Sequence, residues 1–259
     1  MEEKILRLYI EEQLSMSKIA NMLGISSARV KRVLIKNNIE IRSNNYYKAK
    51  EIDTDFFSKI DSEEKAYVLG FMYADGYITG KYFGFKQSAK DKDILEKIRL
   101  VLKSEHKIGE YINNNGYGQG NTYCSLIVNN EKMVFDLQKL GVVFNKSKIL
   151  RFPNQEQVPF HLLRHFIRGY FDGDGSIYKV AQGNTYGISF TGTQDFLTGV
   201  LNFFRDNGVD TVSQIYKYHD KDIYDYKIGG RNNVKKVRDI LYTDASIFMN
   251  RKKALFDKV

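Results

Sequence analysis

Two aspartates stand at equivalent places in a ten-residue phrase that the sequence uses twice. Residues 67–76 and 166–175 each have Gly at the fourth place, a small residue at the eighth, and then Asp-Gly, which makes the aspartates Asp75 and Asp174. Two carboxylates at equivalent points of a duplicated unit favour a pseudo-symmetric site for divalent metal, because neighbouring carboxylates repel each other until a proton or a cation neutralises them. A single Asp-Gly would more simply end a helix before a turn, and it is the duplication that favours a metal site.

The chemistry expected of such a pair is metal-assisted hydrolysis. Oxygen ligands without cysteine or clustered histidine favour Mg²⁺, or the similar Mn²⁺. Two or more such ions between the aspartates could activate a water and stabilise the leaving oxygen of a phosphodiester. Asp75 and Asp174 are therefore the candidate catalytic and metal-binding residues.

Small residues spaced four apart predict how two helices could bring these aspartates together. Gly70 and Ala74 have this spacing in the first copy, and Gly169 and Gly173 have it in the second. Residues four apart lie on one face of a helix, and two such faces can approach closely because little but backbone lies between them. Packing through Gly70 and Gly169 would set the C-terminal ends of the helices side by side.

Composition favours a polyanionic partner. The 259 residues carry a net charge of +9, with 18 Tyr and 17 Phe. Each Lys or Arg that meets a phosphate releases condensed counterions, so a basic, aromatic-rich chain favours nucleic acid. One cysteine, Cys124, leaves no intrachain disulfide and no cysteine-based zinc site. With no secretory leader and no apolar run of about 20 residues, we expect a cytoplasmic or organellar protein that is neither secreted nor bound to a membrane.

The beginning of the chain has the pattern of a helix-turn-helix. Ser17 is expected to cap a second helix, Gly24 to end it, and Ser26 to cap a third. We expect a DNA-binding domain over residues 1–45, followed by a linker over residues 46–60. A plain three-helix bundle with a solvated basic face is the alternative. The residues expected to contact DNA here are Arg29, Lys31, Arg32, Lys36 and Arg42.

The remaining sequence consists of two units with the same order of elements. Helix, two strands, helix, two strands and helix are expected over residues 61–153 and again over 154–259. The segment Phe85–Ser88 recurs as Phe190–Thr193, each time before a helix. The expected fold is therefore α+β, with two pseudo-symmetric αββαββα units after a small all-α domain.

The repeated phrases resemble those of a known family. Val68–Gly76, Ile167–Gly175 and the closing segment Tyr242–Lys252 are similar to the LAGLIDADG homing endonucleases in their single-chain, two-motif form. The resemblance covers roughly residues 60–257. It implies saddle-shaped sheets that grip the major groove of DNA, two metal-holding aspartates that cut both strands, and a monomer, because both motifs lie in one chain.

The resemblance also implies residues that assist the aspartates. Family members often carry a Gln and a basic residue near the scissile phosphates, and Gln87 and Thr193 are the polar candidates. Aligning Ser125–Ile127 with Tyr226–Ile228 sets Leu126 opposite Lys227. The second unit therefore offers Lys227 or the nearby Arg231 as a basic group, and the first unit offers none.

Other positions complete the expected site. The backbone carbonyls of Ala74 and Gly173 are implied to join the metal shell, and Asp172 is interpreted as a capping or packing residue. The runs Lys146–Lys148 and Arg251–Lys253 are solvated charge or, equally, phosphate contacts. The residues expected to contact DNA in this part of the chain are Lys86, Lys146 and Arg251.

The function expected from these features is that of a site-specific homing endonuclease of the intron-encoded kind, which makes double-strand breaks in DNA with a long target site. A second interpretation is a DNA-binding regulator that does not cleave. Loss of one motif aspartate would favour it, and both aspartates are present. A third interpretation is an intron maturase that binds RNA. The sequence neither indicates nor excludes this activity.

Overall fold

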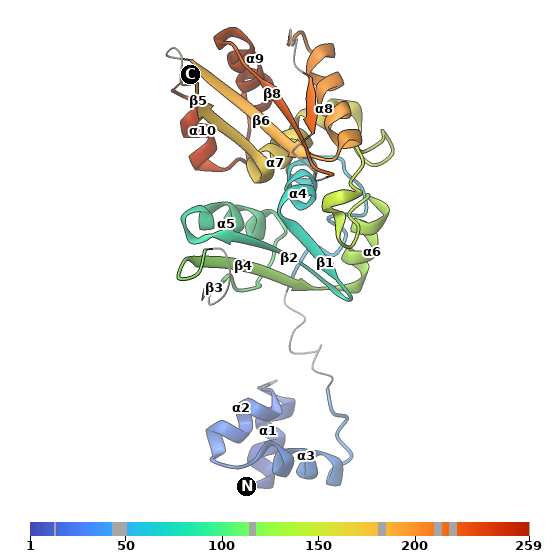
Figure 1. Ribbon diagram of the computed structural model, residues 1–259. Helices are drawn as coiled ribbons and strands as arrows, with labels where there is room; N and C mark the ends of the chain where they lie inside the picture. Colours follow the sequence, from blue (N-terminus) through green and yellow to red (C-terminus); the bar gives the residue numbers. More distant parts are fainter. Residues whose placement is uncertain are drawn as a thin grey trace. The chain divides into compact units, whose positions relative to one another are not determined.

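The two copies of the repeated phrase lie in two α-helices, α4 (Glu63–Ala74) and α7 (Leu163–Asp174), which pack against each other (Figure 1). The computed structural model describes residues 1–12, 14–42, 51–113, 118–180, 185–209, 214–217 and 222–258. The chain divides into two compact units, residues 1–51 and residues 52–259.

The segment expected to be a linker belongs in part to the larger unit. Residues 43–50 lie outside the described part of the chain. Phe56, Phe57 and Ile60 are buried and join the main hydrophobic core. Two adjacent phenylalanines favour burial over a solvated linker, because each removes a large apolar area from water.

The first half of the larger unit contains a four-stranded antiparallel sheet in the order β1-β2-β4-β3. In β2, Phe83 and Phe85 are buried and Lys86 is exposed, because successive side chains of a strand point to opposite faces. The buried face packs against Ile94 and Leu95. The elements are β1 (Gly76–Thr79), β2 (Tyr82–Ser88), η1 (Ala89–Asp91), α5 (Lys92–Val101), β3 (Gly109–Ile112), β4 (Thr122–Asn129), α6 (Glu131–Lys139) and η2 (Lys146–Lys148).

The second half repeats this arrangement in the order β5-β6-β8-β7. The first hairpins of the two halves correspond, since Gly76 pairs with Phe85 and Gly175 pairs with Phe190. The expected α+β fold of two αββαββα units is therefore confirmed. The elements, after η3 (Phe160–Leu162) and α7, are β5 (Gly175–Lys179), β6 (Tyr186–Gly192), α8 (Gln194–Asp206), β7 (Ile215–Lys217), β8 (Tyr224–Ile228), α9 (Arg231–Tyr242) and α10 (Asn250–Phe256).

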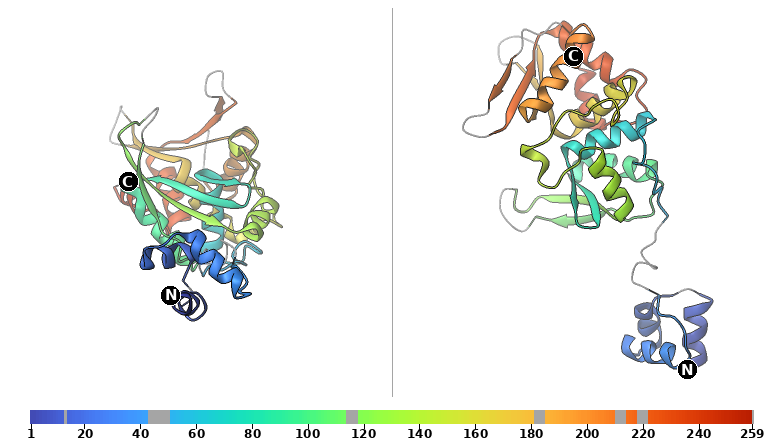
Figure 2. Two further views of the ribbon diagram at one scale, coloured as in Figure 1. Left: turned by 90° about the horizontal axis from the view of Figure 1, so that it is seen from below. Right: turned by 90° about the vertical axis from the view of Figure 1, so that its right-hand side faces the viewer.

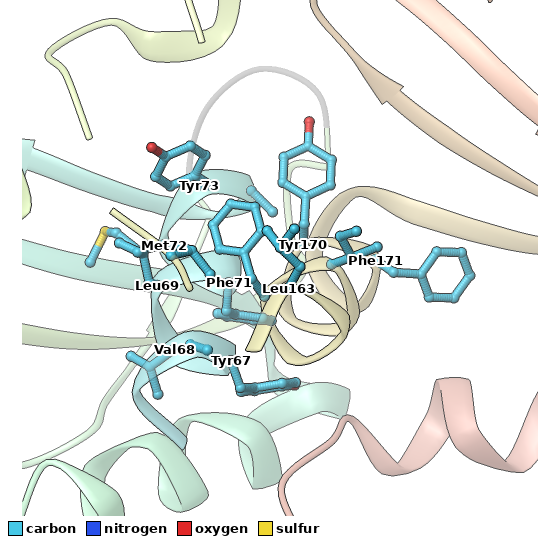
Figure 3. Packing of buried hydrophobic residues seen from close by; sticks show 14 of the residues in the cluster. Tyr67, Val68, Leu69, Phe71, Met72, Tyr73, Leu163, Tyr170 and Phe171 are labelled. Carbon is cyan, nitrogen blue, oxygen red and sulfur yellow. The ribbon is translucent and has the colours of Figure 1, made fainter. Parts of the chain in front are cut away.

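Helices α4 and α7 form the centre of the larger unit and lie between its two sheets (Figures 1 and 2). Every residue from Ala66 to Ala74 is buried, which explains why α4 has no polar face. Aromatic side chains such as Tyr67, Phe71 and Tyr170 fill the space around the helix pair (Figure 3). The motif helices are therefore the shared core of the two halves.

The described residues of the N-terminal unit form the short helices α1 (Glu2–Ile10), α2 (Met16–Leu23) and α3 (Ser27–Lys36). The cap of α2 is Ser15, whose side chain accepts from Lys18 N at 3.2 Å, and not Ser17 as expected. Ser26 caps α3 as expected. Gly24 ends α2 with a φ of 64°, a left-handed conformation that glycine adopts without steric cost.

The helical unit has its own core, formed by the apolar faces of its three helices. The buried residues of this core are Ile5, Leu8, Tyr9, Ile19, Ala20, Val30, Val33 and Leu34. Among the described residues, the structure has no helix both long and apolar enough to span a bilayer.

Candidate active site at the ends of the motif helices

The close approach expected of the two motif helices is present. A Cβ atom built on Gly70 would lie 1.9 Å from the carbonyl oxygen of Phe166, and one on Gly169 would lie 2.0 Å from that of Tyr67. Neither position has room for a side chain. The interface role expected of Gly70 and Gly169 thus has a direct steric reason.

This packing brings the C-terminal ends of α4 and α7 together. Asp75 is the residue that ends α4, and Asp174 is the last residue of α7. A Cβ atom on Gly173 would lie 2.3 Å from Ala74 Cβ and 3.1 Å from Asp75 Oδ2, so the two helix ends touch. The two motif aspartates are therefore neighbours on one edge of the interface.

Burial makes both carboxylates reluctant to ionise. Removal from water is the main cause that raises the pKa of Asp75, and it also raises the pKa of Asp174, to about 6. The charge of Asp75 adds to the shift at Asp174. Such a pair gains most from a nearby cation, because an added positive charge stabilises two buried anions at once.

Gln87, one of the two polar candidates that the family resemblance implies, lies beside Asp75. Its Nε2 donates to Asp75 Oδ2 at 2.6 Å, and its side chain is buried on β2. This hydrogen bond favours the charged form of Asp75 and lowers the pKa of that carboxyl, against the larger effect of burial. Gln87 therefore fixes the orientation of one carboxylate.

The second half has no counterpart of Gln87 on β6. Because Phe85 and Phe190 hold equivalent places in the two hairpins, Gly192 takes the place of Gln87. Thr193, the expected polar candidate, instead caps α8, where its hydroxyl accepts from Phe196 N and donates to Leu150 O. A cavity of about 180 Å³ opens beside Asp174, lined by Tyr73, Ala74, Lys146, Leu150, Tyr170, Asp174, Thr191, Gly192, Thr193 and Ile223.

Two lysines supply the positive charge at the site. Lys146 Nζ donates to the carbonyl oxygen of Ala74 at 2.7 Å. Lys252 Nζ donates to the carbonyl oxygens of Phe171 at 2.6 Å, Gly173 at 3.1 Å and Gly175 at 2.7 Å. The carbonyls of Ala74 and Gly173, which were expected to face metal, thus accept hydrogen bonds from lysine.

Both lysines are electrostatically linked to both aspartates. The charges of Lys146 and Lys252 lower the pKa of Asp75 and of Asp174. In turn, burial lowers the pKa of Lys146, and it lowers that of Lys252 to about 8. Lys252 is 4% exposed. Of the two alternatives given for this run, solvated charge is therefore wrong for Lys252, and a phosphate contact stays a prediction.

The two lysines occupy a shared position at the end of each half, which is the one signal that the sequence offers for them. Lys146 follows α6 and Lys252 follows α9, and these helices end corresponding halves. The phrases Phe144-Asn145-Lys146 and Phe248-Met249-Asn250-Arg251-Lys252 share their Phe, Asn and Lys but differ in spacing. That difference hides the correspondence.

The basic candidates taken from the sequence lie elsewhere. Leu126 pairs with Phe85 and Tyr226 pairs with Phe190, so Ile127 and not Leu126 corresponds to Lys227. The alignment was wrong by one residue, and such a shift moves every side chain of a strand to its opposite face. Lys227 is exposed on β8, and Arg231 is exposed at the start of α9.

Asp172 is a packing residue, in agreement with its interpretation from the sequence. Its carboxylate accepts from Tyr67 OH and Tyr242 OH, each at 2.6 Å, and from the backbone N–H of Met249 at 2.7 Å. The side chain is completely buried. Three donors hold this buried carboxylate within the protein, so it has no face open to substrate.

The residues present fit a hard divalent ion. Asp75 and Asp174 offer neighbouring carboxylate oxygens, which are the ligands that Mg²⁺ prefers. No group of three or more His, Cys, Asp or Glu with the geometry of a metal site occurs among the described residues. The two carboxylates would therefore hold an ion together with water or phosphate oxygens.

The residues expected to contact DNA fall into two groups. Arg29, Lys31 and Arg32 are exposed on α3, and Lys86 is exposed on β2, with its ammonium 3.7 Å from the centre of the Tyr123 ring. These side chains are open to solvent. Lys36 is also exposed and pairs with Glu2 Oε1 at 3.0 Å.

Two further basic candidates are engaged within the protein. Arg42 Cζ lies 3.7 Å from the centre of the Tyr9 ring, and its Nη2 donates to the carbonyl oxygens of Tyr9 and Leu14. Arg251 forms two hydrogen bonds with the carboxylate of Asp91. Both arginines therefore have partners within the protein, while the Arg251 side chain is still 51% exposed, and a DNA contact by either one stays a prediction.

Comparison with known proteins matches each half of the duplicated region to the same family. A family model described as a LAGLIDADG-like domain matches residues 62–141 and 161–242. The DNA-directed RNA polymerase subunit Rpo1C of Methanocaldococcus jannaschii is 36% identical over 112 residues, which are 43% of this chain and 12% of that protein. This chain therefore spans only a small part of the length of the subunit.

Solved structures of the meganuclease I-SmaMI share the fold. A K262A mutant matches with a TM-score of 0.51 and 12% identity, over 74% of this chain and 88% of the other. I-SmaMI bound to uncleaveable DNA matches with a TM-score of 0.50 and 12% identity, over 74% and 87%. At this identity the likeness establishes the fold alone.

Proposed function

The chain belongs to the LAGLIDADG family, and on this premise we propose that it is a site-specific, metal-dependent DNA endonuclease that makes double-strand breaks. One observation carries the proposal. Asp75 and Asp174 meet at the ends of two interlocked helices, with Lys146 and the buried Lys252 beside them. A pair of carboxylates and a pair of ammonium groups at a two-fold centre match the two scissile phosphates of a duplex.

The residues would divide the chemistry among them. Asp75 and Asp174 would hold Mg²⁺ or Mn²⁺, and a bound ion would supply an activated water and stabilise the leaving oxygen. Lys146 and Lys252 would stabilise the negative charge that develops on the attacked phosphate, which they do best from a site with little water. Gln87 would keep the carboxylate of Asp75 in a fixed orientation, through its 2.6 Å hydrogen bond.

Two surfaces would bind the DNA. The open faces of the two sheets are proposed to lie in the major groove, with Lys86 among their phosphate contacts. The N-terminal unit is proposed to act as a helix-turn-helix, whose helix α3 presents Arg29, Lys31 and Arg32. Because both motifs lie in one chain, a monomer would suffice for both strands.

Cleavage of plasmid DNA tests the proposal. The substrates carry the DNA that flanks the gene, joined without the gene, and a randomised insert library serves as a second substrate. The wild type is expected to convert supercoiled plasmid to a linear product with Mg²⁺. Asp75→Asn and Asp174→Asn are expected to abolish this conversion while DNA binding is retained. Asp206→Asn, an exposed aspartate at the end of α8, is the matched control and should cleave normally.

Other outcomes distinguish the alternative functions. Sequence-selective DNA binding without cleavage, in Mg²⁺ and in Mn²⁺, would contradict the nuclease proposal and favour a regulator. Tighter binding to structured RNA than to any DNA would favour a maturase. Cleavage by both aspartate variants would show that the motif carboxylates are not the catalytic groups.

A further inference from the structure

The segment that brings Lys252 into the site is fixed to the opposite half of the larger unit. Arg251 Nε lies 2.8 Å from Asp91 Oδ1, and Arg251 Nη2 lies 3.0 Å from Asp91 Oδ2. Asp91 ends the short helix η1 of the first half and is 5% exposed. A bidentate pair of this kind fixes distance and orientation together, because two parallel hydrogen bonds join two planar groups.

A second contact fixes the same segment. Lys97 Nζ, on α5 of the first half, donates to the carbonyl oxygen of Phe248 and to Asn250 Oδ1, each at 2.7 Å. These two acceptors lie just before Arg251 in the chain. Helix α10 has only seven residues, so contacts outside the helix contribute much of its placement.

The segment that carries Lys146 in the first half is likewise anchored on the second half. The segment after η2, which follows Lys146, is bound to the start of α8. The hydroxyl of Thr193 donates to the carbonyl oxygen of Leu150, and Phe152 N donates to Asp195 Oδ2 at 3.3 Å. Each lysine therefore reaches the motif helix of its own half from a segment that is anchored on the other half.

From this exchange we propose that Arg251 is a positioning residue for the site, which acts through Asp91 to hold Lys252 at the C-terminal end of α7. The role of Lys252 rests on the proposed function, whereas the anchoring itself does not. Arg251 touches no part of the aspartate pair, and its effect passes through the backbone of α10. Breaking the pair would leave the Lys97 contacts as the remaining polar anchor described above for this segment, and the ammonium of Lys252 would spend less time on the three carbonyl oxygens that it contacts.

Amine labelling measures this placement without any DNA. An acylating reagent followed by mass spectrometry reports the reactivity of Lys252 and of its neighbour Lys253, whose side chain is 36% exposed and serves as the internal reference. Lys252 is expected to be protected in the wild type and to gain several-fold in reactivity in Arg251→Ala and Asp91→Ala. The side chain of Asp91 makes no capping hydrogen bond to α5, so its replacement removes no cap.

DNA binding and single-turnover cleavage separate positioning from a phosphate contact. Both alanine variants are expected to cleave about 10- to 100-fold more slowly, because small displacements of a positioned group cost that much. Their DNA affinity should stay close to that of the wild type. The double variant should be no slower than either single one, and the exchanged pair Asp91→Arg with Arg251→Asp should recover part of the rate.

Three results would overturn the proposal. One is that Arg251→Ala binds DNA more weakly and lowers the slope of log affinity against log salt concentration by about one, while Asp91→Ala changes neither quantity. That pattern is expected of a phosphate contact. Another is that Lys252 stays protected in both variants. The third is additive losses of rate in the double variant, which would show that the two residues act separately. If the wild type cleaves no DNA, the proposed function fails, and the labelling result still decides whether Arg251 places Lys252.

Discussion

The contact between Gly70 and the backbone of α7 gives a sharp test of how the site is assembled. In Gly70→Ala, the new Cβ would lie 1.9 Å from the carbonyl oxygen of Phe166 and 2.8 Å from its carbonyl carbon, whereas ordinary contact begins at 3.4 Å. The obstacle is backbone, which no rotamer change can remove. The two helices would have to separate by about 1.5 Å, or α4 would have to distort.

The expected loss of stability follows from two opposed effects. Forced overpacking of a core costs about 1–3 kcal/mol and at times more, and a rigid backbone on both sides favours the upper end of that range. Alanine in a helix is better than glycine by about 1 kcal/mol, which offsets part of this cost. We therefore expect a net loss of about 2 kcal/mol in the free energy of unfolding. For a unit of this size it corresponds to a melting temperature lower by about 4–8 °C.

Thermal and urea denaturation of Gly70→Ala and Gly169→Ala would measure the effect. Gly229→Ala is the matched control, because a Cβ atom added there would have no heavy atom within 4 Å and the φ of this residue is not positive. Separated helices would also separate the aspartates, so single-turnover cleavage should fall by about 100-fold. If Gly70→Ala proved as stable as Gly229→Ala, the close packing of the motif helices would be refuted.

Three other perturbations test separate parts of the structure. Asp174→Asn should stabilise the metal-free protein at pH 7.5 by up to about 3 kcal/mol. The reason is that the pKa of Asp174 is raised to about 6 in the folded protein, so the wild type loses stability as pH rises from about 4 through 6. The gain, measured by denaturation at each pH, should vanish below pH 4, and a constant gain would contradict the assigned cause. Asp172→Asn should instead destabilise the fold by about 2–3 kcal/mol, since its three donors would meet an amide, and an unchanged urea midpoint would argue against that cluster. Removal of residues 1–51 should leave the melting temperature of the larger unit unchanged, because the two units have separate cores. DNA affinity and its salt dependence should both fall, and an unchanged anisotropy titration would exclude a DNA contact by α3.

Much of the fold could be predicted because its signals are local. The repeated phrase marks both motif helices, and the small residues Gly70 and Gly169 mark the face along which they meet. The order of helices and strands follows from apolar spacing within each segment. Strand register was less accessible, and the assignment of Leu126 opposite Lys227 was wrong by one residue. Register depends on the partner strand, which a single segment does not contain.

The charges around the aspartates could not be assigned in the same way. Lys146 and Arg251 have the sequence context of ordinary surface residues, yet one reaches a carbonyl beside the site and the other pairs with Asp91. Each of these contacts joins segments that are far apart in the chain. The residues next to a lysine or arginine in the sequence do not show which acceptor will lie beside it in the folded protein.

The sequence by itself determined the duplication, the two aspartates and the helix faces that join them, because spacing along a helix is enough to place such residues. Only the tertiary structure decided which basic groups lie near those aspartates, and that each half anchors the lysine-bearing segment of the other. The physical reason is that burial and pairing of charge depend on every element that closes around a group. Lys252 is 4% exposed only because α10 lies against both halves of the protein.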